Sequence, residues 1–267
     1  MAILIPRKKD YWQKQLTAFD SVNWGHELLD GGGAVWLFHN KDAPENLSYS
    51  DSVYEYQLDN SAGAPTPSAL GVEFGSGSDY VSATINESWD TTSTFGLVSS
   101  GPVPLSFNLL SAAATGFPDR YIKIGTNGYD VRNGGSRALY VGGVAHAGGE
   151  PLNLSLVLGG PSSQTMYRQG ALVTSTTNSV SNISCNRFAI NAILDSTPAP
   201  GTSWTCAMAY YLRSPLNAGE IAELHFNPSQ ILKSRRKYWV LPTAAAPTGF
   251  QAAWAMSSRR AGLIGAR

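Results

Sequence analysis

Carboxylates and histidines are the side chains in this chain that could carry catalysis. Cleavage of a sugar bond needs two carboxylates placed across it, and Glu55 and Asp59 come nearest to such a pair. Their spacing of four puts both on one face of a strand at best, so we interpret them as solvated strand polarity. The sequence has no Gly-x-Ser-x-Gly, His-Glu-x-x-His or phosphate-loop motif. The four histidines are not spaced as metal ligands would be: they are His26, His39, His146 and His225.

These observations predict that the chain is not an enzyme. The two cysteines, Cys185 and Cys206, make neither a disulfide framework nor a metal cluster. We interpret them as reduced, buried thiols, with a disulfide between them as the alternative. No cofactor is expected.

Charge is distributed unevenly along the 267 residues, although 19 basic and 19 acidic side chains cancel. Residues 1–15 carry four basic side chains and one acid, and residues 233–267 carry seven basic side chains and no acid. Residues 16–232 carry 8 basic and 18 acidic side chains, a net charge of −10. An acidic body with basic ends disfavours a nucleic-acid protein with a basic face on its body. No apolar run approaches the roughly 20 residues of a membrane span, so we expect no membrane contact.

Short strands bounded by Gly, Asn, Asp or Pro must position these side chains. Their spacing of about 8–12 residues is typical of a β-sandwich or jelly roll. Asn127-Gly128 and Asn133-Gly134 are the strongest hairpin signals, because both residue types tolerate positive φ. The expected strands are Ala34–His39, Val53–Leu58, Ala69–Phe74, Tyr80–Thr84, Thr94–Ser99, Leu105–Leu110, Arg120–Gly125, Gly128–Arg132, Arg137–Val141, Leu152–Leu158, Gln164–Gln169, Ala171–Thr174, Phe188–Leu194 and Thr202–Leu212.

One helix is expected after the last of these strands. Asn217 can act as its N-cap, with Glu220 three residues later as the capping-box partner. Ile221 and Leu224 then share one face. Asn227-Pro228 lies where a helix of two to three turns would end.

The order of these elements resembles the concanavalin-A-like, or laminin-G-like, jelly roll. The stretch 69–81, ALGVEFGSGSDYV, resembles the early hairpin of that family, and 152–158 followed by 166–173 resembles a later strand pair. The most specific match is 204–224, which resembles the closing strand and helix. The resemblance implies an all-β sandwich with one short C-terminal helix and extended terminal arms.

The two ends resemble segments of tailed-bacteriophage proteins that carry this jelly roll. The matching stretches are 4–13 with Val22-Asn-Trp24, 224–233 and 250–256. In 224–233, Ser229 stands where the phage signature has Trp. The resemblance implies a virion structural protein but not its position in the particle. We expect multiple copies per particle, in a fibre- or collar-like appendage at the tail or head–tail junction, with a capsid decoration protein as the alternative.

We therefore predict three parts: a docking arm at 1–29, a jelly roll at 30–227 and a basic aromatic arm at 228–267. The arms are rich in Trp, Tyr and Arg, which dominate interface hot spots. Their partners would be other virion proteins, namely portal or adaptor, tail or capsid subunits, and nucleic acid is not expected. The predicted docking residues are Arg7, Lys8, Lys9, Tyr11, Trp12, Arg235, Arg236, Lys237, Tyr238, Trp239 and Trp254.

A carbohydrate-binding receptor module on the virion is the competing function, with a host-surface glycan as partner. The resemblance implies that loops at one edge of the sandwich could bind sugar or calcium. Asp79, Asp130 and Asp195 are the candidates expected in turns. Asp79 is the best of them, because it adjoins Tyr80 and sugars stack on aromatic rings. The alternative is that Asp79 serves only turn chemistry.

Overall fold

The computed structural model divides the chain into two compact units, Met1–Ser234 and Arg235–Arg267. All residues that the structure describes belong to the first unit. The described residues are 19–23, 25–38, 50–52, 58–62, 65–68, 70–75, 79–84, 92–104, 109–114, 119–142, 152–181, 185, 187–193, 197–198 and 203–234.

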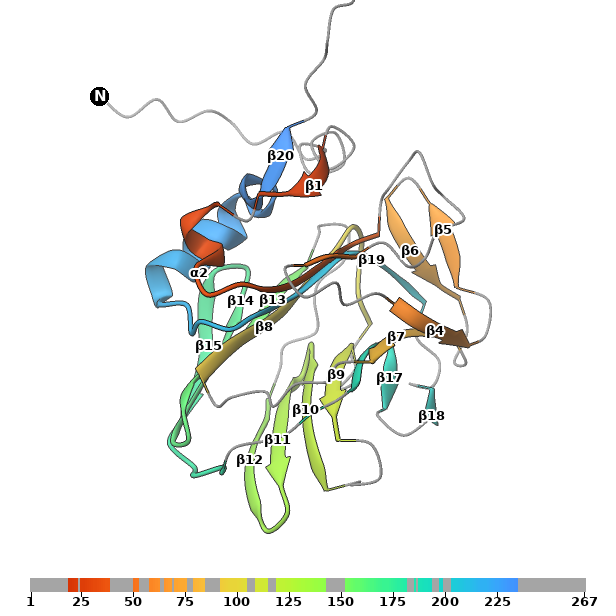
Figure 1. Ribbon diagram of the computed structural model, residues 1–267. Coiled ribbons are helices and arrows are strands. Elements are labelled where there is room, and N and C mark those ends of the chain that lie inside the picture. Colours follow the sequence, from red (N-terminus) through yellow and green to blue (C-terminus); the bar gives the residue numbers. More distant parts are fainter. Residues whose placement is uncertain are drawn as a thin grey trace, which may run out of the picture. The chain divides into compact units, whose positions relative to one another are not determined.

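The larger sheet in this part of the chain contains nine antiparallel strands (Figure 1). Its order is β15-β14-β13-β8-β19-β2-β3, and β6 pairs with one end of β19 and with β5. The central strands β2, β8, β13 and β19 are buried on both faces. The strands are β2 Gly33–Leu37, β3 Ser50–Ser52, β5 Thr66–Ser68, β6 Gly71–Phe74, β8 Thr92–Ser99, β13 Asn153–Gly160, β14 Ser163–Arg168, β15 Ala171–Thr176 and β19 Trp204–Leu212.

The smaller sheet contains seven antiparallel strands among the described residues, in the order β12-β11-β10-β9-β16-β7-β4. Side chains along β10 and β11 alternate between the core and the outer face, as expected for a sheet with one covered face. The strands are β4 Leu58–Ala62, β7 Tyr80–Thr84, β9 Leu110–Ala113, β10 Arg120–Gly125, β11 Gly128–Asn133, β12 Ser136–Val141 and β16 Arg187–Ile190. A separate two-stranded ribbon pairs β17 Ala192–Ile193 with β18 Thr197–Pro198.

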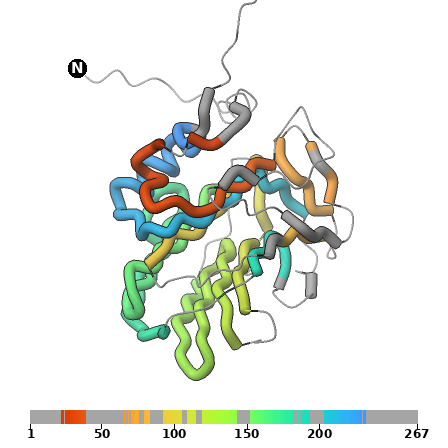
Figure 2. The backbone as a smooth tube through the Cα atoms, in the orientation of Figure 1, coloured from red at the N-terminus to blue at the C-terminus, as the bar shows by residue number. Residues whose placement is uncertain are grey.

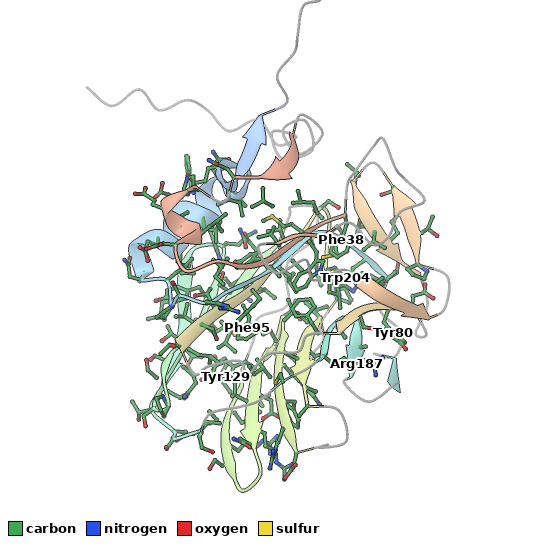
Figure 3. All side chains as sticks on the ribbon, viewed as in Figure 1. Phe38, Tyr80, Phe95, Tyr129, Arg187 and Trp204 are labelled. Atoms are coloured by element: carbon green, nitrogen blue, oxygen red, sulfur yellow. The ribbon has the colours of Figure 1, made fainter. Side chains whose placement is uncertain are left out.

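The main hydrophobic core lies between the two sheets. Trp36 of the larger sheet stacks on Phe188 of the smaller one, with ring centroids 4.2 Å apart. Figure 3 shows Phe95 and Tyr129 in the same interlayer, and both are fully buried. Burying each large apolar side chain stabilises the fold by about 1.5–3 kcal/mol. This packing confirms the predicted β-sandwich.

Two tight turns connect β10, β11 and β12 where the Asn-Gly signals predicted hairpins, with residues 126–127 and 134–135 as the turn residues. Gly125 pairs with Gly128 across the first turn, and Asn133 pairs with Ser136 across the second. Gly128 has φ of 148°, and a Cβ there would collide with the carbonyl oxygen of Tyr140. Glycine is therefore required where β11 begins.

Helix α2 (Ala218–Phe226) has the predicted capping box at its start. Asn217 Oδ1 accepts from the amides of Gly219 and Glu220, and Glu220 Oε2 accepts from the amide of Asn217 at 2.7 Å. Ile221 and Leu224 are fully buried against the outer face of the nine-stranded sheet. The helix therefore covers that face.

Segments from both ends of the described chain cover the same face. Strand β1 (Phe19–Val22) pairs antiparallel with β20 (Leu232–Ser234). Val22 and Ile231 join α2 in one hydrophobic cluster against the nine-stranded sheet. The short 3₁₀ helices η1 (Glu27–Leu29) and η2 (Pro228–Ile231) flank these strands. Figure 2 shows the red N-terminal stretch beside the blue C-terminal helix.

This pairing changes the predicted domain boundaries. Residues 19–29 and 228–234 are predicted as parts of the arms, but the structure buries apolar side chains from both ranges against the outer face of the nine-stranded sheet, namely Val22, Leu28, Leu29 and Ile231. Residues 1–24 show no strand period in the sequence. Strand β1 forms there because it pairs with β20, about 210 residues later in the chain. The remaining parts of both predicted arms lie outside the described residues.

Three strand predictions differ from the structure or fall outside it. Residues 105–108 of the strand predicted at Leu105–Leu110 lie outside the described residues, and β9 begins at Leu110. The strand predicted at Phe188–Leu194 is interrupted at Asn191, whose φ of 62° ends β16. Residues 53–57 of another prediction lie outside the described residues. In the part of the chain that the structure describes, no helix is long and apolar enough to cross a membrane.

Candidate functional site

Asp79 and Tyr80, the best sugar-binding candidates from the sequence, are both buried. Asp79 Oδ2 accepts from the amide of Gly75 at 2.8 Å, and its carbonyl oxygen accepts from Asn191 Nδ2 at 2.7 Å. Tyr80 is 9% exposed and packs with two alanines. These contacts match the turn-chemistry alternative and do not present the pair to a ligand.

His225 takes part in a buried hydrogen-bond network that the sequence did not reveal. Its Nε2 lies 2.7 Å from Ser155 Oγ, which lies 2.6 Å from the hydroxyl of Tyr210. The amide of Gly170 donates to His225 Nδ1. The helix α2, the strands β13 and β19 and the turn before β15 each contribute one of these groups. A serine beside a histidine raises the question of a catalytic dyad.

The hydrogen-bond directions argue against a dyad. Because Gly170 donates to Nδ1, the neutral ring of His225 carries its hydrogen on Nε2 and donates to Ser155. A general base must instead accept the proton of the serine. Burial also lowers the pKa of His225 to about 4 and raises that of Tyr210. We therefore interpret the network as structural, as expected for a lone histidine.

The two cysteines are buried and not bonded to each other, as the sequence interpretation held. Burial raises the pKa of Cys185 to about 12 and raises that of Cys206 further. Neither thiol therefore ionises near neutral pH. Among the described residues, no group of three or more His, Cys, Asp or Glu is placed to hold a metal ion.

Basic side chains gather instead on the outer face of the seven-stranded sheet. Lys123, Arg132, Arg137 and Arg187 project from β10, β11, β12 and β16, and we call this set the basic face. Their strand neighbours, such as Ile122, point into the core, so period-two alternation places all four on the opposite side. Arg187 is labelled in Figure 3.

The three arginines of the basic face lie in one row across the sheet. Arg137 pairs with Arg132, Arg132 with Tyr121, Tyr121 with Ala113, and Ala113 with Arg187. Adjacent strands are about 4.8 Å apart, so Arg132 and Arg187 are separated by roughly 14 Å at their Cα atoms. Tyr121 and Ala113 are buried between them and pack together. The charged groups therefore flank a buried centre.

Asp130 is the acid that the structure places on this face. It was expected in a turn, but it lies within β11, because the turn begins only after Asn133. Its Oδ1 accepts from Arg137 Nε at 2.9 Å, and its Oδ2 accepts from Arg137 Nη2 at 2.8 Å and from the Tyr121 hydroxyl at 2.9 Å. Burial, and then this carboxylate, raise the pKa of Tyr121. Lys123 Nζ lies 4.3 Å from the centre of the Tyr121 ring.

Asp130 therefore neutralises Arg137. The other basic side chains of the basic face are Lys123, Arg132 and Arg187. Both carboxylate oxygens are occupied within the protein, so Asp130 is not a free calcium or sugar ligand. The third acidic candidate, Asp195, lies outside the described residues.

Strand alternation in the sequence is a signal for three of the four residues of the basic face. Three strands were predicted at 120–125, 128–132 and 137–141, joined by two-residue turns. Alternation along these strands would have placed Lys123, Arg132 and Arg137 together. Arg187 could not have been added, because its strand reaches the sheet through long-range pairing with β9 and β7.

The charge of the body is also divided. Residues 19–90 carry 12 acidic side chains and 1 basic one, a net charge of −11. Residues 91–234 carry 6 acidic and 8 basic side chains, a net charge of +2. The acidity predicted for the whole body thus belongs to its first third, and the basic face belongs to the rest.

The predicted docking residues at both ends lie outside the described residues. The structure describes only the strands to which these segments are attached, namely β1 and β20. These residues are Arg7, Lys8, Lys9, Tyr11, Trp12, Arg235, Arg236, Lys237, Tyr238, Trp239 and Trp254.

No protein-family model matches this chain, and no curated protein matches it. Solved structures do. The binding domain of botulinum neurotoxin serotype G is 10% identical with a TM-score of 0.52, and the match covers 74% of this chain and 51% of that one. The binding domain of botulinum neurotoxin DC in complex with SialylT is 12% identical with a TM-score of 0.53, over 75% and 52%.

A third structure concerns the cell entry of botulinum neurotoxin type C and its dependence on two ganglioside molecules. It is 13% identical with a TM-score of 0.51, and the match covers 74% of this chain and 51% of that one. The chain thus spans about half the length of the structures it matches. At such low identity the likeness shows the fold, a jelly-roll β-sandwich. The first two structures are described as binding domains, and the prediction of a non-enzyme is consistent with that description.

Proposed function

We propose that this chain is a structural component of a tailed-bacteriophage virion, a jelly-roll module held in the particle by its terminal segments. The phage-like stretches at 4–13, 224–233 and 250–256 suggest the setting. A fibre- or collar-like appendage at the tail or head–tail junction is the favoured position. A decoration protein on the capsid is the alternative.

One observation carries the anchoring part of the proposal. Phe19 pairs with Ser234, so the segments that precede β1 and follow β20 are attached to the sandwich at neighbouring residues. Residues 1–18 carry a net charge of +3 and residues 235–267 a net charge of +6. Two basic, aromatic segments starting from one place would act as a single anchor.

The partner of this anchor would be an acidic protein surface. Complementary charge steers association and sets register, and buried Trp and Arg side chains supply most interface energy. A portal, adaptor, tail or capsid subunit with an acidic surface would meet this requirement. The acidic residues 19–90 of a neighbouring copy would as well.

Deletion of 1–18 and 235–267 tests the anchor without removing β1 or β20. We expect the shortened protein to fold and to be lost from purified particles, as measured by quantitative mass spectrometry of virions. As a control, the full-length variant R259K/R260K keeps the charge of the C-terminal segment and should incorporate fully. Full occupancy by the shortened protein would refute the proposal.

A carbohydrate-binding receptor module is the second candidate function, compatible with the first. It is favoured by the structural neighbours, whose descriptions name SialylT and gangliosides. A glycan array probed with the purified full-length chain tests it. Specific binding to any glycan supports this function, and a blank array rejects it.

A further inference from the structure

The outer faces of the two sheets differ in what covers them. The outer face of the nine-stranded sheet is covered by α2, β1 and η2. On the seven-stranded sheet, the β17–β18 ribbon covers one part, where Ser111 Oγ donates to the carbonyl of Ala192 at 2.9 Å. The neighbouring part carries the basic face, and the side chain of Arg137 is 48% exposed there.

The positive charges of the basic face do not all contribute to the stability of the fold. Arg132 and Arg137 are directly opposite on β11 and β12, and like charges in that position are destabilising. Asp130 compensates one of them. Arg132 uses Nε to bond the carbonyl of Gly134. Within the described residues the structure gives the side chain of Arg187 no hydrogen-bond or ion-pair partner, although its backbone pairs in the sheet. An anionic ligand would compensate both.

The chemistry of the ligand follows from the side chains. Guanidinium groups recognise planar carboxylates through two parallel hydrogen bonds. Leu139 and Val141 are 37% and 62% exposed on the same face of β12, which suits the apolar face of a sugar ring. A long polyanion such as nucleic acid is disfavoured, because residues 19–234 as a whole carry a net charge of −9.

We propose that the basic face binds a carboxylate-bearing oligosaccharide, with Arg132 and Arg187 as the anion contacts. The ligand lies across β10–β12 and β16, with its sugar rings against Leu139 and Val141. This inference rests on the second candidate function and specifies its ligand and site.

Titration calorimetry of the full-length chain tests the site, with 3′-sialyllactose and a glucuronic-acid-terminated trisaccharide as acidic probes and lactose as neutral probe. We expect at least one acidic probe to bind and lactose not to bind. The double variant R132Q/R187Q should bind about tenfold more weakly for each charge-assisted bond lost. The matched variant R168Q/R213Q removes two arginines elsewhere and should bind like the wild type. Circular dichroism and thermal unfolding confirm that each variant is folded.

Equal affinity for lactose, equal affinity of R132Q/R187Q, or no binding to either acidic probe would each overturn the inference. If the chain binds neutral glycans on the array and R132Q/R187Q binds them equally well, the proposed site is wrong, but the carbohydrate-binding function remains supported. A blank array would remove the carbohydrate function itself. Competition by a short DNA oligonucleotide that abolishes sugar binding would assign the face to nucleic acid instead.

Discussion

His225 is buried with both ring nitrogens in hydrogen bonds, so its protonation conflicts with its surroundings. A second proton would place an N–H against the amide of Gly170, which already donates to Nδ1. The ring bonds Ser155 Oγ, which in turn bonds the hydroxyl of Tyr210, and neither hydroxyl carries a compensating negative charge at neutral pH. A lone histidine could be expected to be structural from the sequence. Its partners could not, because they lie 55 and 70 residues away along the chain.

We predict that acid destabilises the fold through His225. Its pKa is about 4 when folded and about 6.5 when unfolded, so the unfolded chain binds the proton first as the pH falls. Stability from this group is complete above pH 6.5 and lost as the pH approaches 4. The loss between pH 7.5 and pH 5 should be about 2 kcal/mol, measured by urea unfolding. H225Q should lack this part of the slope, and an equal slope in both proteins would contradict the account.

Strand β8 shows how elements depend on one another. Gly96 lies beneath the ring of Tyr210 on the neighbouring strand, and a Cβ there would meet that ring and lie 2.6 Å from the carbonyl oxygen of Leu154. The ring lies over this glycine, and its hydroxyl bonds Ser155 Oγ. Local signals were sufficient to predict most strands, the Asn-Gly turns and the capped helix, because each depends on nearby residues. The β1–β20 pairing and the break at Asn191 depend on long-range contacts and could not be predicted in this way.

The substitution Gly96→Ala should therefore destabilise the protein by about 2–4 kcal/mol, as expected for overpacking against backbone. Gly101→Ala is the matched control, because nothing lies within 4 Å of a Cβ at that position. It should change stability by less than about 0.5 kcal/mol. Chemical denaturation of both variants measures the difference. Equal stabilities would show that Tyr210 can move away from the strand.

The two proposed interaction regions lie on opposite sides of the sandwich. The β1–β20 pair, to which the basic terminal segments are attached, packs on the outer face of the nine-stranded sheet. The basic face lies on the outer face of the seven-stranded sheet. A sandwich held at the first side would therefore present the second to its surroundings. The sequence predicted that the ends and body differ in charge, but not that the body itself has an acidic and a basic part.

Electron cryo-microscopy of the virion that contains this protein tests the central claim most directly. We predict that the fitted sandwich has β1 and β20 against a neighbouring virion protein and the seven-stranded sheet facing solvent. The opposite orientation, with Arg132 and Arg187 buried against the particle and β1 and β20 turned outward, would contradict it, and so would the absence of the protein from the particle.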